Sequence, residues 1–303
     1  MTSSQKFGHW TALACIVAIA AGCGSTREGA WETGADSVVL DESAKAQEAA
    51  AIAAAQAAWA QRGDAAQAKA AIDNWQKAVD INPGNAQAWT DLSHAQFFYA
   101  DCFSRWDDAN PDARKAGHEA GIKSAERALA ALSPSFSEKM AAGDRVETAI
   151  EVLGPSAVPA LYWRSSNLGA WASLESFATL LSYKDEVRAT MEFCLNNDAA
   201  YWYAGPDRYF GIFYARAPGF SGGDMNKSME HFERSIAAHP NYLGTHTYVA
   251  SEWAVKEVDR PLFDKEINYV LSTSADVVPA ITPENVCEQR KAKDLQAEAD
   301  DLF

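Results

Sequence analysis

The sequence is short of positive charge and of apolar runs long enough to cross a membrane. Its 26 Lys and Arg residues stand against 41 Asp and Glu residues, a formal net charge of −15 at pH 7. Nucleic-acid binding rests on many Lys and Arg contacts to phosphate, so this balance excludes nucleic acid as a partner. It also argues against docking on anionic lipid headgroups. The apolar run at residues 10–21 is too short to span a bilayer, which needs ~20 apolar residues.

Several catalytic and cofactor motifs are missing as well. The sequence has no His-Glu-x-x-His metal motif, no phosphate-binding glycine loop and no Cys-x-x-Cys pair. Among its six histidines, His231, His239 and His246 are spaced so that two could share a helix face, but surface or capping positions explain them more simply. The abundant carboxylates suit an acidic helical surface. We therefore predict a protein that is not an enzyme and that holds no cofactor and no metal.

The N-terminus has the features of an export signal. Lys6 precedes the apolar run at residues 10–21, and small residues come directly before Cys23. The segment resembles a bacterial lipoprotein signal, in which the matching cysteine becomes the lipidated first residue, although Ala20 stands where leucine is usual. Ordinary secretion with an incidental cysteine is the alternative. We predict a signal peptide at residues 1–22 and a periplasmic protein anchored to a membrane by lipid on Cys23.

The mature chain is predicted to have two parts. Residues 23–40, with three glycines and mixed polar residues, are predicted to be the lipidated N-terminus and a tether. Gly24 lacks the acidic side chain that often retains lipoproteins in the inner membrane, which favours the outer membrane. Asp41 is a candidate N-cap for an alanine-rich helix. Residues 41–303 are predicted to form a single helical domain.

That domain carries an irregular repeat of helical hairpins. Small and aromatic residues recur where paired helices would meet, namely at Ala71, Trp75, Ala78, Trp89, Leu92, Leu168, Gly169, Ala172, Ser228, Phe232 and Ser235. One hairpin cannot bury its apolar face alone, so such units stack on their neighbours. The spacing between the units is uneven. We therefore predict an all-α fold, a divergent tetratricopeptide-like solenoid of helical hairpins.

Three cysteines remain in the predicted domain: Cys102, Cys194 and Cys287. Their number is odd and they are far apart in the sequence. One disulfide with a free thiol is an alternative in an oxidising compartment, but we favour three buried apolar thiols.

Aromatic residues are concentrated in one segment. Residues 201–214 contain seven aromatic side chains on both sides of a Gly205-Pro206 break. Arg208 would lie near the start of the next helix, an unfavourable place for a cation unless an anion lies nearby. Such a cluster is usually plain core. If it is a site, rigid aromatics beside one cation suit an apolar ligand with an acidic end. The candidate ligand-binding residues are Trp163, Asn167, Trp171, Arg208, Tyr209 and Tyr214.

Several segments, in order along the chain, resemble one family, the T component associated with tripartite ATP-independent periplasmic (TRAP) transporters. The matching residues lie at 159–163 with 168–169, at 205–211, at 214–218, at 222–232, at 283–285 and at 291–293. Together with the lipoprotein signal they cover most of the chain. Ser228 and Ser235 depart from the family pattern, where alanine is usual.

The resemblance implies a periplasmic lipoprotein with a tetratricopeptide-like fold. It further implies association with the solute-binding component of the transporter, the holding or passing on of ligand, and a homotrimer with pores. We therefore expect a non-enzymatic accessory to TRAP-type uptake that binds a small apolar organic acid. The alternative is a scaffold lipoprotein for envelope protein assembly, because concave helical solenoids commonly bind peptides or proteins.

Overall fold

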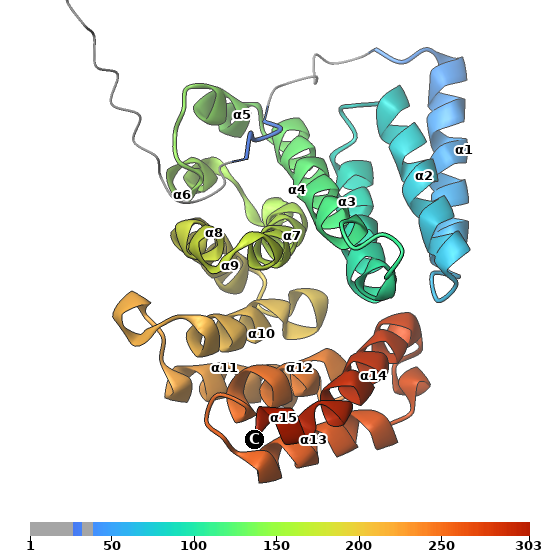
Figure 1. The fold of residues 1–303 in the computed structure, drawn as a ribbon. Coiled ribbons are helices and arrows are strands. Elements are labelled where there is room, and N and C mark those ends of the chain that lie inside the picture. Colours follow the sequence, from blue (N-terminus) through green and yellow to red (C-terminus); the bar gives the residue numbers. More distant parts are fainter. Residues whose placement is uncertain (1–26, 32–38) are drawn as a thin grey trace, which may run out of the picture.

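The computed structural model describes residues 27–31 and 39–303. The predicted signal peptide (residues 1–22) and lipid anchor (Cys23) lie outside the described residues. In the described part the regular elements are helices, with no strand among them, which confirms the predicted all-α class (Figure 1). None of these helices combines the length and the apolarity that crossing a bilayer requires.

Four long helices form two packed pairs at the start of the domain. They are α1 (Glu42–Trp59), α2 (Ala65–Ile81), α3 (Ala86–Cys102) and α4 (Ala113–Leu132). The predicted N-cap is confirmed, because the Asp41 carboxylate accepts a hydrogen bond from the Ala44 amide at 2.8 Å. Asp64 and Asn85 cap α2 and α3 in the same way. A cap of this kind is typically worth about 1 kcal/mol.

Five helices follow and enclose the largest apolar core. They are α5 (Pro134–Ala141), α6 (Val146–Ala149), α7 (Val158–Glu175), α8 (Phe177–Ser182) and α9 (Lys184–Asn197). Helix α7 lies between α4 and α9 and supplies the fully buried Leu161 and Leu168. The site described below depends on this helix, because one of its faces packs in the core while another is left to line a cleft.

Helices α1 to α9 form a first body, and the last six helices form a second body beneath it (Figure 1). They are α10 (Tyr201–Arg216), α11 (Met225–Ala238), α12 (Leu243–Tyr248), α13 (Arg260–Ser272), α14 (Thr282–Ala297) and α15 (Ala299–Leu302). Helices α10 and α11 are in close contact: a Cβ at Gly211 would lie 2.5 Å from the Phe232 ring, and the Ser228 hydroxyl donates to the Gly211 carbonyl at 2.6 Å. The small residues predicted at this hairpin are fully buried, and packed consecutive pairs confirm the helical-hairpin arrangement.

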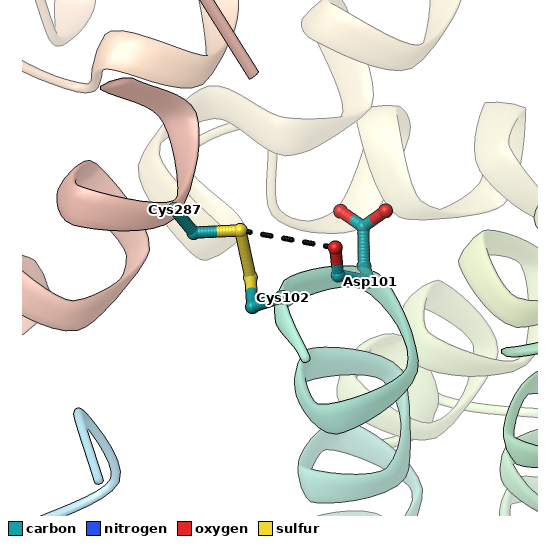
Figure 2. Close-up of side chains that lie close together, drawn as sticks. All are labelled: Asp101, Cys102 and Cys287. Carbon is teal, nitrogen blue, oxygen red and sulfur yellow. Dashed lines mark hydrogen bonds between the residues drawn. A yellow bond between two sulfur atoms is a disulfide. The ribbon is translucent and has the colours of Figure 1, made fainter. Parts of the chain in front are cut away.

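The expectation of three buried thiols was wrong for two of the cysteines. Cys102, the last residue of α3, and Cys287 of α14 form a disulfide (Figure 2), with a Cα–Cα distance of 5.4 Å. Cys194 is free and buried. The bridge joins residues 185 apart in sequence because the curved chain brings α14 back to the end of α3. Sequence separation carries no information about such a return.

A short N-terminal segment, residues 27–31, packs on the domain beside α4 and α5 (Figure 1). The Arg27 guanidinium binds both oxygens of the Glu126 carboxylate, at 2.6 and 2.9 Å, and the Ala30 amide donates to the same carboxylate at 2.7 Å. The Trp31 ring meets Phe136 edge to face, with centroids 5.5 Å apart. Part of the predicted tether is therefore held against the fold.

Candidate functional site

The central feature of the molecule is a cleft of about 770 Å³ between the two bodies. Helices α3, α4, α7, α8 and α9 supply one side, and α10, α12 and α14 supply the other. The lining is aromatic over one part and charged over another. This volume lies within the range of clefts that take small organic ligands, ~300–1,000 Å³.

A left-handed backbone turn shapes the aromatic part. Trp202, Tyr203 and Ala204 have φ of 45°, 57° and 54°, so the chain breaks here and regular α-helix resumes at Gly205. The break lies just before the predicted Gly205-Pro206 position. A Cβ at Gly205 would lie 2.3 Å from the Tyr162 hydroxyl oxygen, so only glycine allows this approach. Non-glycine residues held in this region cost about 1–2 kcal/mol each and concentrate at functional sites.

Arg208 holds this turn in place. Its guanidinium donates to the carbonyl oxygens of Trp202 (3.1 Å) and Tyr203 (3.0 Å) and to the Tyr162 hydroxyl (3.1 Å). It also lies over the Tyr242 ring, 4.1 Å from the centroid. Arg208 is 4% exposed and lies, as predicted, in the first turn of the resumed helix. In these contacts the hydrogen bonds of Arg208 are accepted by neutral oxygens, and none is accepted by a carboxylate.

Trp163 anchors the aromatic wall. Its ring stacks on His94 with centroids 3.8 Å apart and meets Trp202 edge to face at 5.0 Å, and its Nε1 donates to the Tyr201 hydroxyl at 2.9 Å. Burial lowers the pKa of His94 well below its usual value, with the nearby Arg62 acting in the same direction. The neutral imidazole is therefore a flat, uncharged surface beside Trp163.

The charged part of the cleft is built around Asp101. Its carboxylate contacts Lys291 of α14, Arg105 at 3.2 Å and Arg114 of α4 at 3.3 Å, and Lys291 also binds Glu288 at 2.7 Å. Burial alone would raise the pKa of Asp101, but Lys291 and Arg105 hold it well below its usual range. These side chains and the disulfide join α14 to α3 at one end of the cleft.

The residues proposed from sequence separate into two groups. Trp163, Arg208 and Tyr209 line the cleft. Asn167 does not line it, because it is fully buried, donates to the Trp163 carbonyl at 2.9 Å and contacts His118 Nδ1 at 3.1 Å. Trp171 packs on Tyr183, and Tyr214 packs on His231 beside α11; neither of the two is among the residues that line the cleft.

Other lining residues were not singled out from the sequence. They include Tyr162, Trp202, Phe213, Tyr242 and Tyr248, together with the charged group around Asp101. Trp202 and Phe213 belonged to the aromatic segment, whose composition was the available signal. Tyr242, Tyr248 and the charged residues come from distant parts of the chain and carry no local pattern.

One catalytic motif does occur in the sequence. Residues 219–223 have the Gly-x-Ser-x-Gly spacing of a nucleophile elbow, with Ser221 at its centre. That motif works where a strand turns into a helix and exposes the serine. Here Ser221 ends a short 3₁₀ turn, η4 (Gly219–Ser221), that follows helix α10. The structural context of the motif is absent from this part of the chain.

One group of side chains has the spacing of a metal site. Carboxylate and sulfur atoms of Asp101, Cys102 and Cys287 lie within 4.8 Å of one another. Figure 2 shows the two sulfurs bonded together, with Cys287 Sγ 3.9 Å from the Asp101 carbonyl oxygen. A disulfide sulfur has no proton to donate and is not a thiolate ligand, and the Asp101 carboxylate is bound by cations. In its disulfide form this group does not fit a metal ion.

A family model described as TRAP transporter T-component matches residues 95–303, well over half of the chain. No curated protein matches it. The matched region begins within α3 and contains the cleft residues of α7, α10 and α14 described above.

Proposed function

The chain belongs to the TRAP transporter T-component family, and from that premise we propose that it is a non-enzymatic periplasmic lipoprotein that holds a small apolar organic acid for TRAP-type uptake. Membership implies an accessory role in TRAP transport. In the proposed role, the protein binds the solute-binding component of the transporter. A lipid on Cys23 anchors it to the outer membrane.

The cleft is the observation that supports ligand holding. It encloses about 770 Å³ between aromatic walls and a charged end, which is the form expected of a small-molecule site. The left-handed turn that presents Trp202 costs conformational energy, and such strain is found mostly where geometry serves function.

Two tyrosines of α10 provide a matched test of the ligand site. Tyr209 lines the cleft, whereas Tyr214 lies five residues later and packs on His231. We expect Tyr209→Leu to lower the amount of small molecule that co-purifies with the protein, because the ligand loses one aromatic surface. Tyr214→Leu should leave it unchanged. Native mass spectrometry measures both, and equal ligand content in the two variants would contradict the site.

The partner is tested by purification from native membranes. We expect the solute-binding protein of a TRAP transporter to co-purify with the full-length chain, and light scattering to give the trimer that the family resemblance implies. Recovery of outer-membrane assembly proteins instead would favour the scaffold alternative.

The membrane anchor is tested by Cys23→Ala. We expect this change to move the protein from the membrane fraction to the soluble fraction, because the acyl chains provide the attachment. An unchanged membrane fraction, measured by quantitative immunoblot, would contradict the anchor.

A further inference from the structure

The charged end of the cleft contains two guanidinium groups that its carboxylates bind only in part. At the charged end, Arg105, Arg114 and Lys291 face the carboxylates of Asp101 and Glu288. Asp101, Glu288 and Lys291 are buried, Arg114 is half-buried and Arg105 is exposed. Asp294 and Glu298 also line the cleft and are exposed, so water and salt screen them as they screen Arg105.

The two arginines of this group are incompletely bound. Both reach the same oxygen of Asp101, at 3.2 and 3.3 Å, whereas a well-formed pair of this kind is ~2.7–2.9 Å. Lys291 takes the other oxygen. Arg114 Nε is buried and has no hydrogen-bond partner among the described residues. Each guanidinium has five N–H donors, so much of this donor capacity is unused.

Arg208, the cation expected from sequence to meet the acid, is less suited to that role. Its guanidinium is already bound to the carbonyls of Trp202 and Tyr203 and to the Tyr162 hydroxyl. A ligand carboxylate would have to compete with bonds that keep the left-handed turn in shape.

We propose that Arg105 and Arg114 bind the carboxylate of the ligand, whose apolar body lies along the aromatic wall at Trp163. This inference rests on the proposed ligand-holding function and assigns the acid end of that ligand. Two guanidinium groups around one carboxylate supply several charge-assisted hydrogen bonds.

The distance between the charged end of the cleft and its aromatic wall indicates the length of the ligand. Phe97 lies four residues before Asp101 on α3, a rise of about 6 Å, and its ring centroid is 5.5 Å from that of Trp163. The charged end and the aromatic wall are therefore on the order of 10 Å apart. A medium-chain aliphatic acid or an arylalkyl acid spans that distance.

Calorimetry with defined probes tests the assignment. The probes are straight-chain monocarboxylates from butanoate to dodecanoate, together with the primary amide of the best-bound member, which has the same shape without the charge. We expect the wild-type protein to bind the acid at least about tenfold more tightly than the amide, since a hydrogen bond to a charged group is worth about tenfold or more.

Glutamine variants then separate charge from folding. Arg114→Gln and Arg105→Gln should each weaken acid binding about tenfold and leave amide binding unchanged, so the amide reports that the cleft is intact. Arg145→Gln is the matched control, because Arg145 is exposed and pairs with Glu147 outside the cleft.

Two results would overturn the assignment. If the acid binds the wild-type protein but its affinity is unchanged in the Arg105 and Arg114 variants, the carboxylate lies elsewhere and ligand holding stands. If the wild-type protein binds neither acids nor amide, ligand holding fails as well.

Discussion

Removal of the Cys102–Cys287 disulfide is expected to destabilise the protein strongly. The bridge closes a loop between residues 185 apart in sequence, and it ties α14 to the end of α3 beside the cleft. Its removal, by reduction or in the Cys102→Ala/Cys287→Ala variant, frees that whole loop in the unfolded chain. The main effect is therefore on the entropy of the unfolded state.

The size of the effect follows from the loop length. Chain-entropy theory gives about 5 kcal/mol for a loop with this separation of 185 residues. Measured losses for native disulfides run to about 2–5 kcal/mol, so we expect about 3–5 kcal/mol here. That is a large part of the ~5–15 kcal/mol by which domains are usually stable. Contacts such as the Arg62–Glu284 ion pair, 2.8 Å, would still hold α14 in the folded state.

Urea unfolding followed by circular dichroism measures this loss. The wild-type protein is compared with and without a reducing agent, and the double alanine variant serves as the control, since reductant should not change it further. A difference in the free energy of unfolding below about 1 kcal/mol would refute the reasoning, because it would mean that the bridge does not constrain the unfolded chain.

Three further changes test other parts of the structure. Glu126→Gln should cost about 3 kcal/mol in thermal or urea unfolding, because it leaves the buried Arg27 guanidinium without its carboxylate partner, whereas Arg164 keeps Glu186. Burial lowers the pKa of His118 from 6.5 to about 4, so the unfolded chain takes up a proton first as pH falls. Stability should be full above pH 6.5 and fall by about 3 kcal/mol by pH 4, and His118→Gln should show a smaller fall in urea titrations. Gly205→Ala should destabilise by about 1–3 kcal/mol, since its Cβ would meet Tyr162; an unchanged melting temperature would show that the Tyr162 ring moves aside freely.

Much of the fold could be predicted because its signals are local. Asp41 caps a helix that begins at the next residue, and Ser228 and Phe232 sit at the helical spacing that α11 needs to pack on α10. Capping depends on neighbouring residues and pairing on periodicity, and both can be read from one segment.

The site could be predicted only in part, because it joins distant segments. The aromatic segment was visible and supplies Tyr209 and Trp202, but Lys291 reaches the cleft only because α14 returns to α3. The same return makes the disulfide. Asn167 and Trp171 share a helix with Trp163, yet helical spacing alone does not show which face of α7 borders the cleft and which packs in the core.

Arg208 offsets the strain of the left-handed turn that presents Trp202 to the cleft. Three left-handed residues cost roughly 1–2 kcal/mol each, or about 3–6 kcal/mol together. Hydrogen bonds from a charged donor are worth about 1.5–3 kcal/mol each, so the two bonds from Arg208 to the carbonyls of Trp202 and Tyr203 recover about 3–6 kcal/mol. The strain and the bonds that offset it are of the same size. The guanidinium is therefore better explained as the group that keeps Trp202 against Trp163 than as a free receptor for an acid. This is why the proposed ligand carboxylate is assigned to the other end of the cleft.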